Sequence, residues 1–351
     1  MNKTSSSLQK GFTLIELMVA LTLGLILVAA AIQLFTGGLM SSHLQRANAE
    51  IQDSGVFGVD YMLRDLRLAN VGNVNNLEIN DQTSYGGIVF TASDSSSSAN
   101  VNFVPKVSSS AYLNSTLLSR GAGDTVSTTN NHWKGLSNVK DASTGTASVS
   151  DQLTIQFIAP SNMFNCEGVE VFAGDLVVQR YFLRVDANGS GTGNTDLALA
   201  CDANTPASTA AGVSAQPAIV TGLGTAGQIV IPRVDHFHVL LKVRNHEGNL
   251  VEYTIPQYRA AAAEARRVVL AAEADADNPE KAAVGVPRVL AVQVSVLIRS
   301  TNNAKNNVVD PAQASYVMLD QTVKANDSTT RFLRRVYSST VALRNAMGEK
   351  L

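Results

Sequence analysis

An apolar stretch near the N-terminus restricts the fold of this chain more than any other feature. It runs almost unbroken from Phe12 to Phe35, behind a short polar segment that carries Lys3 and Lys10. Residues 17–35 alone are just long enough to cross the hydrocarbon core of a bilayer as a helix. Glu16 is the one carboxylate inside the stretch. A charge in a membrane segment costs roughly 2.5–3.5 kcal/mol, which makes Glu16 a candidate functional residue.

The polar segment at residues 1–11 is predicted to be a leader that differs from an ordinary secretory signal. An ordinary signal is cleaved at small residues after its apolar region, but here the run continues past Ala29-Ala30-Ala31. Cleavage is therefore expected before the run, after Gly11, and the membrane segment would stay in the mature protein. Because Lys3 and Lys10 precede the run, the positive-inside rule places the N-terminus in the cytoplasm and the rest of the chain outside.

The helical pattern continues beyond the membrane segment but changes character. Apolar or small residues recur at three- and four-residue spacing, while charged residues occupy the other faces. This pattern predicts one helix that leaves the lipid, packs one face on a soluble domain and ends near Asn70. A continuous helix from Phe12 to Asn70 would be roughly 90 Å long. The predicted packing face comprises Leu44, Ala47, Ile51, Gly55, Val59, Met62, Leu66 and Ala69.

The remainder of the chain predicts short strands separated by polar loops, with one inserted helix near 260–277. A long helix followed by many strands predicts an α+β fold, in which the helix packs on an antiparallel β-sheet domain. The expected parts are a leader (1–11), a transmembrane half of the helix (12–36), an amphipathic half (37–70) and a β-rich outer domain (71–351). The predicted strands are 87–90, 101–104, 153–157, 176–185, 234–243, 250–255, 288–299 and 331–344, the last as one strand or a pair.

The segment 288–299 has the clearest strand pattern in the chain. Its residues alternate with a period of two, so that successive side chains point to opposite faces of a sheet. One face is predicted to be aliphatic and the other largely polar. The aliphatic face comprises Val292, Val294, Val296 and Ile298, and the other carries Gln293, Ser295 and Arg299.

Composition limits the partners and the redox state of the chain. Charged residues make up 16% and the net charge is −2, so no basic stripe is present that would neutralise nucleic-acid phosphates. The two cysteines are Cys166 and Cys201. In a domain outside the cytoplasm such a pair can be oxidised, which favours a Cys166–Cys201 disulfide over two unrelated buried thiols.

A polar segment between residues 186 and 196 has part of the pattern of a calcium-binding loop. Oxygen-bearing side chains alternate along it, and Gly191 stands at the position of the sharp turn. The bidentate Glu expected at the twelfth position is replaced by Leu197, so a flexible polar turn is the alternative interpretation. The calcium candidates are Asp186, Asn188, Ser190, Thr192 and Asp196.

Neither a zinc site nor an active site is predicted. His236 and His238 are two residues apart and would share one face of a strand, but no third ligand is near them in the sequence. The chain contains no G-x-S-x-G, no phosphate loop, no H-E-x-x-H and no dinucleotide fingerprint. The sequence therefore favours a structural protein without a cofactor, apart from the weak calcium candidate.

Three segments carry a resemblance to a known group of proteins. The sequence Lys10-Gly11-Phe12-Thr13-Leu14-Ile15-Glu16 resembles the class III signal of type IV pilins and of type II secretion pseudopilins. The segments 61–70 and 334–345 resemble minor pilins of the PilW type. The J-type minor pseudopilins share a similar leader and helix end, and they are the second family that the chain resembles.

The resemblance implies a processing site and an assembly residue. Prepilin peptidase would cut after Gly11 and N-methylate Phe12, and Glu16 would pair with the terminal amine of a neighbouring subunit. The chain would sit in the inner membrane with its domain in the periplasm, and later at the tip of the pilus.

The implied partners are other minor pilins, the major pilin and a tip adhesin, in pili that serve motility, adhesion and DNA uptake. Two alternatives stay open at this point. One is a minor pseudopilin at the tip of a type II secretion pseudopilus, and the other is a single-pass membrane-anchored binding domain that joins no filament.

Overall fold

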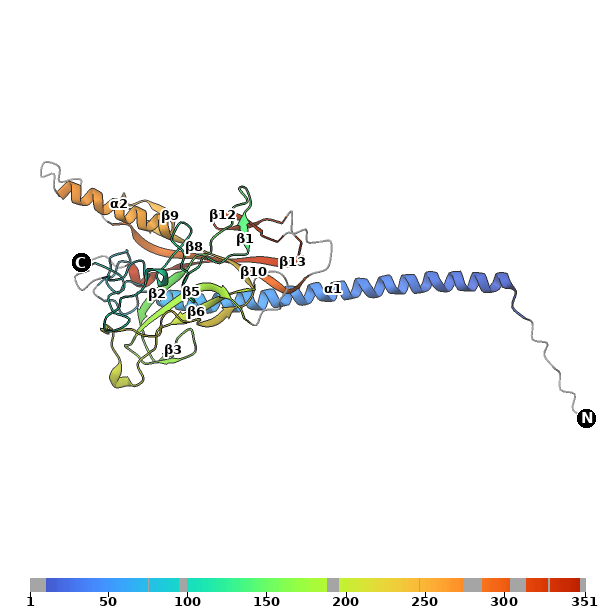
Figure 1. Cartoon of the computed structure of the whole chain (residues 1–351), viewed down its shortest axis with the longest axis horizontal. Coiled ribbons are helices and arrows are strands. Elements are labelled where there is room, and N and C mark those ends of the chain that lie inside the picture. Colours follow the sequence, from blue (N-terminus) through green and yellow to red (C-terminus); the bar gives the residue numbers. More distant parts are fainter. Residues whose placement is uncertain are drawn as a thin grey trace, which may run out of the picture.

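Helix α1 dominates the computed structural model and extends over 55 residues, from Leu14 to Leu68. The structure describes residues 11–74, 76–94, 100–187, 196–245, 247–273, 286–303, 314–327 and 329–347. The first half of α1 protrudes from the body, and the second half enters the β-rich domain (Figure 1). Within those ranges, α1 is the one helix long and apolar enough to cross a membrane.

The second half of α1 buries one side against the domain, as the residue spacing predicted. The residues of the predicted face from Ala47 to Ala69 are buried, and Leu44 is half-buried. The prediction missed Gly58, Leu63 and Asp65, which are also buried. The helix ends at Leu68, and two residues later Asn70 has a φ of 68°, in the left-handed region that Asn tolerates.

Two four-stranded antiparallel sheets form the body of the domain. The first has the order β2-β5-β6-β7 and the second has the order β13-β10-β8-β9. The first sheet comprises β2 (Leu153–Ile158), β5 (Leu176–Val185), β6 (Leu197–Ala203) and β7 (Gln228–Ile231). The second comprises β8 (Val234–Arg244), β9 (Leu250–Thr254), β10 (Arg288–Asn303) and β13 (Phe332–Ala342).

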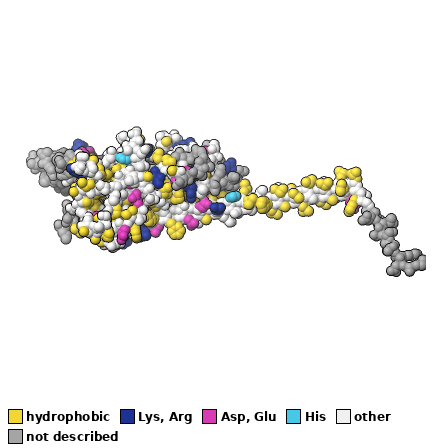
Figure 2. All heavy atoms as spheres, turned by 60° about the horizontal axis from the view of Figure 1, so that its bottom comes forward, with side chains coloured by type: hydrophobic (Ala, Val, Ile, Leu, Met, Phe, Trp, Pro, Cys, Tyr) yellow, Lys and Arg dark blue, Asp and Glu magenta, His cyan; other side chains and the backbone are white. Residues whose placement is uncertain are grey.

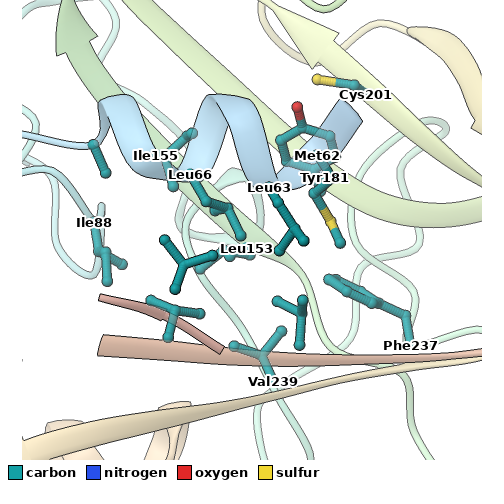
Figure 3. Close-up of a cluster of buried hydrophobic side chains, with 14 of the residues drawn as sticks. Met62, Leu63, Leu66, Ile88, Leu153, Ile155, Tyr181, Cys201, Phe237 and Val239 are labelled. Carbon is teal, nitrogen blue, oxygen red and sulfur yellow. The ribbon is translucent and has the colours of Figure 1, made fainter. Parts of the chain in front are cut away.

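The core lies where α1 and both sheets meet. Met62, Leu63 and Leu66 project from the helix among side chains of the strands, which include Tyr181 from the first sheet and Val239 from the second (Figure 3). All of these residues belong to one continuous cluster of buried apolar side chains. The end of α1 is therefore a structural part of the domain and not a tether to it.

Smaller elements cover the outside of the sheets. A three-stranded sheet has the order β1-β12-β11, and a two-stranded hairpin pairs β3 with β4. Short 3-10 helices occur at Ser115–Leu117, Ala210–Gly212 and Arg344–Ala346. The small strands are β1 (Val139–Asp141), β3 (Met163–Phe164), β4 (Glu170–Val171), β11 (Tyr316–Met318) and β12 (Gln321–Ala325).

The inserted helix α2 spans Ile255–Glu273 and lies at the end of the molecule opposite the N-terminus (Figure 1). It begins earlier than the predicted 260, because Ile255 and Tyr258 in its first turn are fully buried. Arg266 anchors it farther along through two hydrogen bonds of 2.6 and 2.5 Å to the carboxylate of Asp81. Residues 274–277 of the predicted helix lie outside the described residues.

Strand β10 has the predicted alternation, but both of its faces are covered. Val292, Val294, Val296 and Ile298 face the main core. On the opposite face, Ser295 and Arg299 are almost completely buried, and Leu297 packs with Val323 and Met318 of the small sheet. The sequence could not indicate this cover, because β11 and β12 come later in the chain and are too short to show a pattern.

Two of the predicted strands are wrong. Residues 87–90 and 101–104 make only isolated bridges, Ile88 with Ile155 and Phe103 with Ala92. The buried side chain of Asn102 replaces part of the strand pairing, since its Oδ1 accepts from the backbone N–H groups of Phe90 at 2.9 Å and Thr91 at 3.2 Å. The prediction also left out β6, β7 and the small sheet, and segment 331–344 contains the single strand β13.

Candidate functional site

The start of α1 brings Glu16 next to the predicted cleavage site. Thr13 is the N-cap, and its Oγ1 accepts from the N–H of Glu16 at 3.3 Å. In return, Oε2 of Glu16 accepts from the N–H and the Oγ1 of Thr13, both at 3.4 Å. This capping box turns the carboxylate back toward Phe12, the residue that would carry a free amine after cleavage. Gly11 is described, whereas residues 1–10 of the predicted leader lie outside the described residues.

The first half of α1 offers Glu16 no cover from its own chain. Phe12 is 85% exposed, and the apolar side chains that follow as far as Phe35 are exposed as well. After Glu16, the next Asp, Glu, Lys or Arg in the sequence is Arg46. The carboxylate therefore has only the two weak donors of Thr13 within the described part of the chain, and it can accept a cation from outside.

The second half of α1 is joined tightly to both sheets. A Cβ placed on Gly55 would lie 2.3 Å from the ring of Tyr337, and one on Gly58 would lie 2.4 Å from Ile231. Side chains at these two positions would push the helix away from β13 and β7, so the glycines permit the close approach. The hydroxyl of Tyr337 also donates to the carbonyl of Ile51 at 3.2 Å.

The two segments that resemble PilW-type pilins meet at the end of α1. Asn345 donates from Nδ2 to the carbonyls of Arg67 at 3.0 Å and Ala69 at 3.4 Å. Asn70 returns the interaction, since its Nδ2 donates to the carbonyl of Asn345 at 2.9 Å. These bonds satisfy carbonyls that the last turn of a helix leaves without an intrahelical partner. The two segments that resemble PilW-type pilins thus fix the end of α1 to the residues that follow β13.

A buried carboxyl on α1 was not predicted from the sequence. The hydroxyl of Tyr181 donates to Oδ2 of Asp65 at 2.6 Å, and both side chains are buried. Burial raises the pKa of Asp65 to about 6, although the Tyr181 hydrogen bond and the charge of Arg64 oppose that shift. The one available signal was that Asp65 lies beside Leu66 on the side of the helix that packs on the domain.

Cys166 and Cys201 form a disulfide, with 6.0 Å between their Cα atoms. Cys166 lies in the loop of the β3–β4 hairpin and Cys201 lies in β6, so the bond ties the hairpin to the first sheet. The hairpin also contacts the helix, because the Tyr61 hydroxyl donates to the Asn165 carbonyl at 3.4 Å. The disulfide therefore holds the hairpin beside the outer face of α1.

Among the calcium candidates, the structure describes Asp186 and Asp196, while Asn188, Ser190 and Thr192 lie outside the described residues. Asp196 is buried, and its Oδ1 forms an ion pair with the guanidinium of Arg299. The N–H of Asp186 donates to the carbonyl of Asp196 at 2.8 Å, so the two described ends of this segment lie side by side. One candidate ligand thus already has a cationic partner, which weakens the case for calcium at this turn.

His236 and His238 share one face of β8, but hydrogen bonds occupy their ring nitrogens. Asp151 and Asp320 hold His238 at 2.8 and 2.7 Å. Burial alone would lower the pKa of His238, yet the hydrogen bonds to these two carboxylates outweigh it and raise the pKa to about 9. Burial, helped by the charge of His238, lowers the pKa of His236 to about 3. No metal-binding cluster occurs in the part of the chain that the structure describes.

Buried arginines are a second feature that the sequence did not indicate. Arg180 and Asp202 are both fully buried and pair at 2.8 Å, and the Asp202 carboxylate also accepts from Gly224 and Thr225. Arg334 pairs with Asp235 at 2.7 Å under the small sheet. Such pairs are costly if one partner is removed, and the Arg180–Asp202 pair also holds loops onto the first sheet, since Arg180 donates to the carbonyls of Asn131 and Thr225.

Two family models match this chain at the places where the geometry is distinctive. Residues 6–32 match the prokaryotic N-terminal methylation motif. Residues 180–345, from β5 to the contacts of Asn345 with the helix end, match Type IV Pilus-assembly protein W. The C-terminal half of the chain thus matches the PilW family of type IV pilus-assembly proteins, and its N-terminal segment matches the methylation motif. Proteins of this family are structural assembly proteins and not enzymes. The packing of α1 on antiparallel sheets is a pilin-like α+β fold.

Several chains among the solved structures are similar to this one. A type IV-like pilin from Thermus thermophilus is 14% identical, with 59% of this chain and 83% of that chain covered, at a TM-score of 0.28. At this TM-score, the similarity adds nothing to what the family models indicate. No curated protein matches the chain significantly.

Proposed function

We propose that this chain is a minor pilin that helps to initiate a type IV pilus and sits at its tip. The observation that carries the proposal is Glu16, a single carboxylate at the start of an exposed apolar helix, directly after the Gly11–Phe12 site. A membrane anchor alone would not need this costly charge.

A charge pair between subunits explains both residues. Cleavage after Gly11 gives Phe12 a positive amine at the positive end of the helix dipole, where the amine is unfavourable and Glu16 is favourable. Buried in a bundle of apolar helices, either charge alone would cost about 3–5 kcal/mol. Glu16 of one subunit and the amine of its neighbour offset this cost when they meet, so the pair would set the axial register of the helices.

The proposed partners follow from this arrangement. Prepilin peptidase would process the chain, and other minor pilins, the major pilin and a tip adhesin would contact it. The apolar half of α1 would hold the subunit in the inner membrane until assembly, with the domain in the periplasm. Pili built in this way would serve motility, adhesion and DNA uptake.

Replacement of Glu16 tests the proposal. The Glu16→Ala chain is expected to be cleaved normally and to lower the number of surface pili at least tenfold, because the amine of the neighbour loses its partner. Gln33→Ala is the matched control, since Gln33 is another polar residue on the apolar half of α1. Normal pilus numbers with Glu16→Ala would refute the role. Loss of protein secretion with intact twitching would instead assign the chain to a secretion pseudopilus.

A further inference from the structure

A pocket on the first sheet has cations in its lining. It measures about 360 Å³ and lies between the loop at residues 130–136 and the end of β5. Lys134 of the loop and Arg184 of β5 line it, and no Asp or Glu among the described residues does. Figure 2, in contrast, shows acidic and basic side chains mixed over one face of the domain. A pocket with charges of one sign favours an anionic ligand.

Buried hydrogen bonds fix the loop before any ligand arrives. Nη2 of Arg180 donates to the carbonyl of Asn131 at 2.9 Å. The indole N–H of Trp133 donates to the carbonyl of Ser150 at 2.9 Å, and its backbone N–H donates to the carbonyl of Thr116 at 3.3 Å. Between these anchors, Asn131 has a φ of 62°, in the left-handed region, and residues held there cluster at binding sites. A wall fixed in this way lowers the entropic cost of binding.

The two cations of the pocket keep their capacity for a ligand. Lys134 is half-buried and forms no ion pair with any residue that the structure describes. Nη1 of Arg184 donates to the carbonyl of Val185 at 3.2 Å, and its buried Nε has no hydrogen-bond partner in the described ranges. The Asp202 carboxylate on the adjacent strand is already paired with Arg180. A guanidinium binds a carboxylate through two parallel hydrogen bonds, so Arg184 suits a carboxylated ligand.

Neutral polar groups and apolar side chains complete the lining. Asn130 and Asn131 contribute amides, which both donate to and accept from hydroxyl groups. Burial lowers the pKa of His132, so its ring is a third neutral polar group at pH 7. Leu136 and Val185 add apolar surface, on which the C–H side of a sugar ring can pack. The volume is at the small end for ligand sites and leaves space for about one sugar ring.

We propose that the pocket between residues 130–136 and the end of β5 binds a sugar that carries a carboxylate. Arg184 and Lys134 bind the carboxylate, and the amides of the loop bind the hydroxyl groups. The inference goes beyond the proposed function and does not rest on it, because residues of a single chain form the pocket.

Titration of the purified full-length chain in detergent tests the site. The probes are methyl glucuronide, methyl glucoside, which has the same ring without the carboxylate, and glucose 6-phosphate. Calorimetry measures the affinity, and the fluorescence of Trp133, the only tryptophan, reports on the loop itself. Methyl glucuronide is expected to bind at least about tenfold more tightly than methyl glucoside, and its affinity should fall as the salt concentration rises.

Two substitutions assign the binding to the pocket. Arg184→Gln and Lys134→Gln should each weaken the binding of methyl glucuronide about fivefold or more, with an unchanged Tm as evidence of folding. If Arg184→Gln fails to fold, the Lys134 variant still decides. Lys140→Gln is the matched control and should bind as the parent does, since Lys140 is also half-buried but lies on β1, outside the pocket lining.

Four results would overturn the proposal: no binding of methyl glucuronide, equal binding of methyl glucoside, tighter binding of glucose 6-phosphate, or an affinity that the substitutions leave unchanged. The titration involves no pilus. A failure of the pocket therefore leaves the proposed function intact, and Glu16→Ala tests that function separately.

Discussion

Asp65 places a titratable group in the joint between α1 and the first sheet, and Asp65→Asn tests its effect. An ordinary Asp has a pKa near 3.9, whereas burial raises the pKa of Asp65 to about 6. The folded chain therefore prefers the protonated carboxyl. Stability from this group is complete below about pH 4, falls as the pH rises through 6, and is lower by roughly 3 kcal/mol at neutral pH.

The Asn variant keeps a neutral group of the same shape, and its Oδ1 can still accept from the Tyr181 hydroxyl. We expect Asp65→Asn to stabilise the protein at pH 7 by up to about 3 kcal/mol and to have little effect at pH 4. Thermal unfolding of the full-length chain in detergent measures this difference. The fluorescence of Trp133, the only tryptophan, is a suitable probe because its side chain is buried.

A second variant separates the carboxyl from its hydrogen bond. Tyr181→Phe removes the donor at 2.6 Å and leaves the Asp65 carboxylate buried without that partner. It should destabilise the protein by about 1–3 kcal/mol at pH 7, and by less at pH 4, where the carboxyl is protonated. An Asp65→Asn chain that is less stable than the parent at pH 7, or whose stability depends on pH as the parent's does, would refute this reasoning.

Three further predictions concern other parts of the domain. The pKa of His238 is raised to about 9, so its charged form stabilises the fold fully below about pH 6.5, and this stability is lost as the pH rises through 9. His238→Gln should therefore lower the free energy of unfolding at pH 7, and by less at pH 10, when both chains are unfolded with denaturant. Gly55→Leu should lower the free energy of unfolding by about 1–3 kcal/mol, because the ring of Tyr337 fills the space beside Gly55. Gly38→Leu, on the open part of α1, is the control and should leave the free energy of unfolding unchanged. Calcium titration should leave the Tm unchanged, since Asp196 pairs with Arg299; an increase in Tm would contradict this.

The sequence by itself determined the helix and its chemistry. The apolar run, the position of Glu16 and the three- and four-residue spacing up to Ala69 are local patterns, and they predicted a helix that leaves the membrane and packs on a domain. The long strands β5, β8 and β10 were also evident, because ten or more residues repeat a period that the backbone imposes. The helix packed on antiparallel sheets is confirmed as the fold.

Only the tertiary structure decided how the pieces meet. The pairing of Asp65 with Tyr181 joins residues 116 apart in sequence, and Tyr337 reaches Ile51 across 286 residues. Short strands such as β11 carry no period of their own, and the loop around Asn102 exchanged strand pairing for side-chain hydrogen bonds. Burial of a charge depends on which distant segment covers it. No local pattern could therefore reveal the buried arginines or the raised pKa of Asp65.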